Sequence, residues 1–169
     1  MLAVGAVVSA ADDHTVLFDR DIDFSTFRTF LVVAPTVSSV RPELKFPALT
    51  TSIVDVARET LVARGLSEGN ASADLALTVW LFSVDYGIGP YGRPGVVNGP
   101  LRGRSGASSG LTVDYTEASL VIDLHRRSDR LLIWRGVYHD EEKDQGKFAG
   151  TLPKGAASLL SQYPPRKAK

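Results

Sequence analysis

The chain has 169 residues, with 19 basic side chains, 19 acidic side chains and no cysteine. This length fits a single domain, because domains cluster at about 100–150 residues. The absence of cysteine excludes disulfides, thiolate nucleophiles, iron–sulfur clusters and zinc sites built from cysteine. The formal net charge of zero argues against a dedicated nucleic-acid-binding protein, because such proteins usually carry a clear basic excess.

An uncharged apolar stretch opens the chain. Residues 2–11 (LAVGAVVSAA) carry no charge, and two aspartates follow directly. This pattern is typical of the hydrophobic region of a signal peptide that runs into a small-residue cleavage site. We therefore expect residues 1–11 to be a signal-peptide remnant; the alternative is a first β-strand or a frayed apolar terminus. No stretch of the chain reaches the roughly 18 apolar residues of a membrane-spanning helix, so we expect no transmembrane segment.

The first half of the chain contains two predicted strands and one predicted helix. Residues 14–20 and 29–33 are short and rich in β-branched and apolar residues, as strands are. From residue 48 to 64, apolar residues recur at three- and four-residue spacing, which predicts an amphipathic helix that ends before Gly65. The residues expected to face the core are Leu49, Ile53, Val56, Ala57, Thr60 and Leu61.

Residues 74–86 (DLALTVWLFSVDY) form the longest predicted strand, and both of its faces are apolar. Side chains alternate between the two faces of a strand. A strand that is apolar on both faces lies in the centre of a sheet or has a second covered surface. One face carries Leu75, Leu77, Val79 and Leu81, and the other carries Trp80, Phe82, Val84 and Tyr86.

A hairpin is predicted in the last third of the chain. Its strands are residues 111–124 and 131–138, and its turn lies within residues 126–130. A three-residue loop would place Trp134 beside Ile122, whereas a two-residue loop would place a charged side chain there. A loop with an odd number of residues keeps the apolar side chains of both strands on the same face, so it is favoured.

The same parity places Asp123 and Arg135 on the face opposite Trp134, where we expect a cross-strand ion pair with a structural role. Residues 153–163 are predicted to form a short helix that stops at two prolines. The order of elements is then β-β-α-β-β-β-α. It predicts an α+β fold in which an antiparallel sheet of about five strands carries two helices packed on one face.

A glycine-rich stretch, residues 87–110, separates the third and fourth predicted strands. It holds eight of the fifteen glycines and three prolines, and its only charges are Arg93, Arg102 and Arg104. Such a stretch buries too little apolar surface to offset the entropy of ordering it, so we expect a long loop without regular structure. Two interpretations stay open: a mobile hairpin connection, or an anion-binding segment that uses the three arginines.

Four patterns resemble chemical motifs, and each lacks the context that its chemistry needs. Residues 87–92 match GxGxxG, but prolines prevent the helix that a dinucleotide site requires. Residues 106–110 match GxSxG but lead into a strand. Aspartates alternate over residues 19–23, but the glycine of a calcium loop is missing. His125 and His139 are expected to lie roughly 25 Å apart. We therefore predict no catalytic, cofactor-binding or metal site.

Short motifs occur in a definite order along most of the chain. They are residues 21–30 (DIDFSTFRTF), 65–66 (GL), 73–75 (ADL), the insert from residue 87, 116–124 (TEASLVIDL), 133–136 (IWRG) and 163–165 (YPP). In this order they resemble the bacterial domain-of-unknown-function 4136 family over about residues 15–165. The resemblance implies an exported, often lipid-anchored envelope domain of α+β architecture with no established activity. The family provides no catalytic residues, and the missing cysteine argues against a lipid anchor here.

We expect residues 12–165 to form one such domain, followed by a basic tail at 166–169. The leading hypothesis is a non-enzymatic periplasmic or envelope-associated domain that binds an unknown envelope protein or small ligand. Its candidate binding face is the aromatic side of the long strand, Trp80, Phe82, Val84 and Tyr86, because exposed aromatic faces mark interaction sites. Full burial of Trp80 and Phe82 within the monomer, under the glycine-rich loop, would exclude this face. A dimer mate is another candidate cover.

Two alternatives belong to other classes of function. One is an envelope enzyme that acts on a cell-wall or lipid substrate with Asp and Arg side chains of the hairpin; a pocket of converging carboxylates with shifted pKa values would favour it. The other is polyanion binding by Arg93, Arg102, Arg104 and the basic tail. No cofactor and no specific nucleic acid are expected, and the oligomeric state is not predicted.

Overall fold

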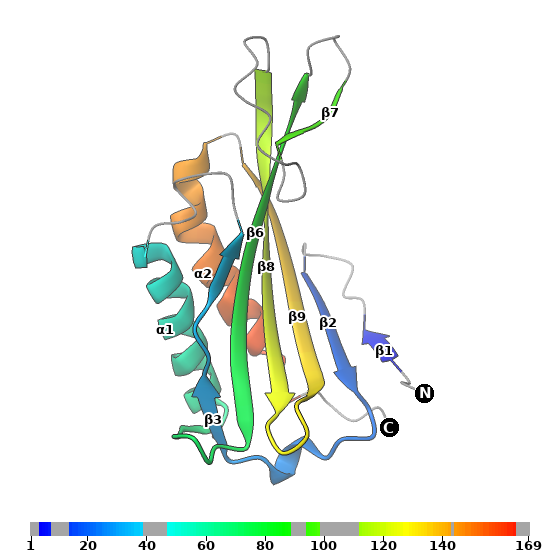
Figure 1. The fold of residues 1–169 in the computed structure, drawn as a ribbon, viewed down its shortest axis with the longest axis vertical. Coiled ribbons are helices and arrows are strands. Elements are labelled where there is room, and N and C mark those ends of the chain that lie inside the picture. The colour runs from blue at the N-terminus through cyan, green and yellow to red at the C-terminus, as the bar shows by residue number, and fades with distance from the viewer. Residues whose placement is uncertain are drawn as a thin grey trace.

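The structure is a computed structural model that describes residues 4–7, 14–38, 47–88, 94–98, 112–142 and 144–164. These residues form one β-sheet of nine strands with two helices, α1 (Pro47–Ala63) and α2 (Phe148–Leu160), on the same face (Figure 1). The strands are β1 (Val4–Val7), β2 (His14–Asp19), β3 (Thr29–Val32), β4 (Thr36–Ser38), β5 (Ser67–Glu68), β6 (Leu75–Ile88), β7 (Pro94–Asn98), β8 (Thr112–Arg126) and β9 (Leu131–Glu142).

Strand β6 lies in the interior of the sheet, paired on both sides, as its two apolar faces predict. The strand order is β1-β2-β9-β8-β6-β3-β5, and β4 and β7 also pair with β6. The helix-facing residues of β6, from Leu75 to Leu81, are at most 1% exposed. The far ends of β6 and β8 extend with β7 beyond the helices (Figure 1).

The α+β class is confirmed, but the expected antiparallel sheet of about five strands is wrong. Strands β3 and β4 run parallel to β6, and β3 also runs parallel to β5. Helix α1 joins β3 and β4 to β6, and a crossover of this kind returns the chain in the same direction. The strands that no pattern indicated, β4, β5 and β7, have only two to five residues, which gives an alternating pattern little length in which to appear.

Part of the glycine-rich stretch is regular. Residues Pro94–Asn98 form β7, which pairs antiparallel with β6 from Asp85 to Ile88, so the expectation of a loop without regular structure is wrong there. Main-chain pairing supplies the hydrogen bonds, so the strand does not depend on a continuous apolar pattern. At the other end of the chain, Val4–Val7 pairs with β2 as a strand. Removal of residues 1–11 on export stays a prediction.

Helix α1 agrees with its sequence pattern. It begins one residue before the predicted start, and Gly65 follows it with a φ of 90°, a conformation that suits glycine. Helix α2 begins five residues earlier than predicted and contains Pro153. Proline here removes the hydrogen bond to the carbonyl of Ala149 and crowds that carbonyl, and the buried Phe148, Leu152 and Pro153 itself hold this part of the helix against the core.

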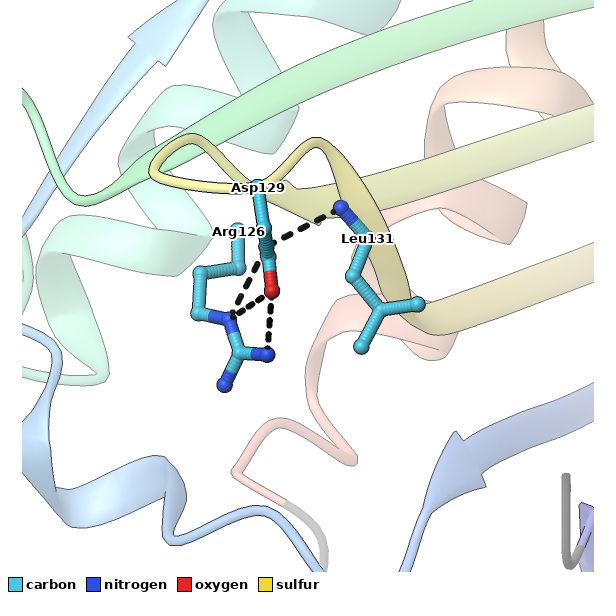
Figure 2. A network of polar contacts seen from close by, with 3 residues as sticks. All are labelled: Arg126, Asp129 and Leu131. Atoms are coloured by element: carbon cyan, nitrogen blue, oxygen red, sulfur yellow. Dashed lines mark hydrogen bonds and ion pairs between the residues drawn. The ribbon is translucent and has the colours of Figure 1, made fainter. Parts of the chain in front are cut away.

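In the β8–β9 hairpin, the side chains of Trp134 and Arg135 lie on the predicted faces of the sheet, but the turn and the register differ from those expected. Its turn has four residues, Arg127–Arg130, instead of three, and a bulge between Leu124 and His125 adds one residue, Ile133, to β9. Trp134 therefore faces Leu124 and not Ile122 as expected. In the turn, Asp129 accepts hydrogen bonds from the Arg126 guanidinium (3.0 Å) and from the backbone N–H of Leu131 (3.2 Å) (Figure 2).

Candidate functional site

The predicted binding face lies on the side of the sheet that faces away from both helices, here called the outer face. Trp80, Phe82, Val84 and Tyr86, here called the β6 strip, alternate with the buried helix-facing side chains of β6. All four are half-buried. Neither Trp80 nor Phe82 is fully buried, so the condition that would exclude a binding face is not met, and the binding role stays a prediction.

Two aromatic rings give the β6 strip a defined shape. The rings of Trp80 and Phe82 stack with centroids 6.5 Å apart and planes 3° from parallel. Trp80 pairs with Thr36 of β4 on one side and with Val121 of β8 on the other. Phe82 lies two pairs further along, beside serines on both neighbouring strands, Ser38 and Ser119. Both rings are half-buried, and the strands paired on both sides of β6 hold their backbone in place.

A serine, a histidine and a glutamate meet on the outer face beside this strip. Ser119 Oγ lies 3.0 Å from Nδ1 of His139, and Glu117 Oε1 lies 3.5 Å from the same nitrogen. In a Ser-His-acid triad the nucleophile and the acid occupy different ring nitrogens. Because both groups share Nδ1 here, the cluster does not support the hydrolase type of enzyme.

The predicted ion pair between Asp123 and Arg135 is confirmed. The two residues face each other in the β8–β9 register and form two hydrogen bonds of 2.7 Å. The Asp123 side chain is 2% exposed and that of Arg135 is 41% exposed. Hydrogen bonding to Asp123 raises the pKa of Arg135 above its ordinary value. Both charges are satisfied within the pair, which fits the expected structural role.

A polar groove lies at the hairpin end of the sheet. It has a volume of about 360 Å³. Arg127 donates from its guanidinium to the carbonyls of Ala71 and Ala73. The groove is lined by Phe27, Ala71, Ser72, Ala73, Asp74, Arg126, Arg127 and Ser128.

Asp74 joins two distant segments beside this groove. Its Oδ2 accepts hydrogen bonds from the backbone N–H groups of Arg28 and Thr29 (both 2.9 Å) and from the Thr29 hydroxyl (3.0 Å). The Thr29 hydroxyl in turn accepts from the backbone N–H of Asp74 (3.0 Å). The hydrogen bonds from the backbone of Arg28 and Thr29 hold the pKa of Asp74 below its ordinary value. A general acid needs a raised pKa, so this carboxylate is a structural bracket.

Tyr163 is buried near Asp74. Burial, with a smaller contribution from the Asp74 charge, raises its pKa to about 12. Its ring packs edge-on against Phe24, with centroids 5.8 Å apart. Residues 21–30, 73–75 and Tyr163, singled out as motifs in the sequence, therefore meet at this end of the sheet, where they stabilise the fold.

Replacing Asp74 with alanine should lower the free energy of unfolding at pH 7 by about 1–2 kcal/mol, because the change removes hydrogen bonds to a charged acceptor. The folded pKa of Asp74 lies below the ordinary 3.8. Its stabilising contribution is therefore present above about pH 4 and is lost as the pH falls through the folded pKa. Urea unfolding from pH 7 to pH 3 should show the two proteins converging on acidification. A constant difference across this range would contradict the assignment.

A second groove, here called the edge groove, lies between the β3–β4 edge of the sheet and α1. Its volume is about 520 Å³ and its lining is mostly apolar. No sequence pattern pointed to it, because its two walls come from separate elements and β4 was not predicted. It is lined by Val32, Val33, Ala34, Pro35, Val37, Pro47, Thr50, Thr51, Val54 and Arg58.

The remaining predicted site residues, Arg93, Arg102 and Arg104, lie outside the described residues, as does the basic tail. Within the described ranges, no three His, Asp or Glu side chains are grouped in a way that would hold a metal ion. None of the described helices combines the length and the apolar character needed to cross a membrane.

Comparison with known proteins identifies the family. The model of the family described as "Domain of unknown function (DUF4136)" matches residues 15–165. No curated protein matches the chain.

Comparison with solved structures finds matches at low sequence identity. A PDZ domain protein from Parabacteroides distasonis ATCC 8503 matches 93% of this chain with a TM-score of 0.61 and 14% identity, and this chain covers 36% of its length. The PelC dodecamer from Paraburkholderia phytofirmans matches 79% of this chain and 84% of its own, with a TM-score of 0.44 and 14% identity. Lipoprotein GNA1162 from Neisseria meningitidis matches 80% and 96%, with a TM-score of 0.44 and 12% identity.

Proposed function

We infer that this chain, which belongs to the DUF4136 family, is an exported envelope domain that binds a partner protein and has no enzymatic activity. The observation that carries the proposal is the β6 strip, a row of half-buried aromatic and apolar side chains on the sheet face that faces away from both described helices. Export is supported by the composition of residues 2–11.

The shape of the outer face favours a protein over a small ligand. Small molecules bind in concave pockets that bury most of their surface. Neither the polar groove nor the edge groove includes a residue of the β6 strip. A stacked tryptophan–phenylalanine pair on a sheet surface suits the apolar centre of a protein interface, where aromatic residues are enriched. The neighbouring Glu117, His139 and Arg135 would then belong to its polar rim.

The enzyme alternative receives no support from the described residues. Asp123 and Arg135 neutralise each other, and the pKa of Asp74 is shifted away from the range of a general acid. Polyanion binding by the glycine-rich stretch depends on arginines that lie outside the described residues, so it stays a prediction.

The natural absence of cysteine allows a sharp test of both export and binding. Phe82→Cys places one thiol in the β6 strip, and Val62→Cys places one on α1, where the native side chain is 54% exposed. Both variants are produced in a bacterial host in which the family occurs, and a membrane-impermeant thiol-reactive photo-crosslinker is added after the outer membrane is opened. We expect both thiols to be labelled and only Phe82→Cys to crosslink to another protein, as detected by mass spectrometry.

The experiment tests export and binding through the β6 strip separately. If neither thiol is labelled in cells but both react in the purified protein, the chain is not exported. If both are labelled and both or neither crosslink, the β6 strip is not a specific binding surface.

A further inference from the structure

The edge groove combines a strand edge with which no described strand pairs and an apolar channel. Two hydrogen bonds show which backbone groups at β3 point outward, away from β6. The carbonyls of Arg28 and Phe30 do so, because they accept from the N–H groups of Ser67 (2.8 Å) and Gly69 (2.7 Å). Because alternate residues of a strand point to the same edge, the backbone of Val32 also points outward. Strand β5 ends at Glu68, so no described strand pairs with Val32 on this side.

The open edge continues into β4. Strand β4 pairs with β6 along its inner side, from Thr36 to Ser38, and no described strand pairs with its outer side. Natural sheets protect such edges, because unpaired N–H and C=O groups invite another strand. Here Pro35 interrupts the edge without closing it, and Val33 beside it is 41% exposed. The edge therefore offers both backbone partners and apolar contact.

Helix α1 forms the opposite wall of the channel and gives one end of it a charge. Val54 and the threonines of the first turns of α1 line the wall. At the end toward β5, Arg58 forms ion pairs with Asp55 (2.8 Å) and with Glu68 (3.0 Å). Two carboxylates against one guanidinium leave a net charge of about −1 there at neutral pH. This end attracts a basic group.

We propose that the edge groove binds an extended segment of a partner protein by adding it as a strand to the β3–β4 edge. The segment carries apolar side chains at alternate positions, which enter the channel against Val33 and Val54. A lysine or arginine follows at the end near Glu68. Main-chain hydrogen bonds to an edge strand provide affinity in this mode, and pockets for alternate side chains provide specificity. The proposal does not depend on the β6 strip, which lies on the outer face.

The test uses random nonapeptides displayed on phage and selected on the full chain. The selected peptides should show alternating apolar residues and one basic residue, and the strongest is then synthesised as the probe. Val33→Lys should weaken its binding at least tenfold, whereas Val62→Lys, at an exposed valine on α1, should leave it unchanged. N-methylation of every second peptide bond removes the N–H groups along one edge of the peptide. It should abolish binding when those groups face the β3–β4 edge and be tolerated when they face away from it. Hydrogen exchange should slow at the Val32 amide on binding.

Several outcomes would overturn the proposal. Equal binding to the Val33→Lys and Val62→Lys variants would place the peptide elsewhere, and protection confined to β6 would assign it to the β6 strip. Tolerance of N-methylation at every position would exclude strand addition. If sedimentation shows that the unliganded chain dimerises and that Val33→Lys makes it monomeric, the occupant of the edge is a second copy of this chain.

Discussion

Replacing Gly155 with alanine should lower the free energy of unfolding by about 1–3 kcal/mol, although alanine is the better helix former. A Cβ at this position would lie 2.5 Å from Cδ1 and 2.7 Å from Cγ of the Tyr138 ring. The clash includes the ring atom next to Cβ, so rotation of the ring does not remove it. Helix α2 must then move away from β9, which opens the core around Leu159. Urea unfolding monitored by circular dichroism measures the change.

Gly150 in the same helix provides the matched control. A Cβ there meets no atom within 4 Å, so Gly150→Ala should raise the free energy of unfolding by up to about 1 kcal/mol through helix propensity alone. Equal effects of the two substitutions would show that α2 does not pack closely on β9. Loss of folding in Gly155→Ala together with a stabilised Gly150→Ala would agree with the packing.

Replacing Arg135 with alanine should lower the free energy of unfolding by about 2–3 kcal/mol. Asp123 is almost fully buried, and its two hydrogen bonds of 2.7 Å come from the Arg135 guanidinium. The substitution leaves a buried carboxylate without this partner, which costs more than the pair itself contributes. The half-exposed arginine keeps the expected effect below that of a fully buried pair. Chemical denaturation at pH 7 measures it.

Two further variants test whether the loss of stability in Arg135→Ala comes from the burial of Asp123 or from the loss of any arginine. Arg126→Ala removes another bidentate pair of the same hairpin, with Asp129 (Figure 2). The Asp129 carboxylate is exposed, whereas that of Asp123 is buried, so the change should be far smaller. The double variant Asp123→Leu with Arg135→Leu should recover most of the stability lost in Arg135→Ala, because it removes the unpaired charge as well. A double variant as unstable as Arg135→Ala would contradict this account.

Local patterns were sufficient for the elements that depend on neighbours in sequence. The three- and four-residue spacing of apolar residues placed α1 within one residue at each end, because a helix satisfies its own backbone. The two apolar faces of residues 74–86 located the central strand. Parity alone put Asp123 and Arg135 on one face, although the bulge at Ile133 that produces this parity left no signal in the sequence.

Contacts between distant residues decided the rest. The bracket between Thr29 and Asp74 joins residues 45 positions apart, and the edge groove is formed by β3, β4, the residues between them and α1. Parallel pairing of β3 and β4 with β6 follows from the path of the chain through α1, which no local pattern records. Strands of two to five residues are stabilised only by the strands beside them.

The sequence by itself therefore determined the apolar and aromatic residues of the β6 strip, the Asp123–Arg135 pair and the class of the fold. Only the tertiary structure decided that the strip lies on the face without helices and that the β3–β4 edge stays unpaired among the described strands. The physical reason is that alternation and helical periodicity are properties of one segment. The partner and register of a strand are properties of two.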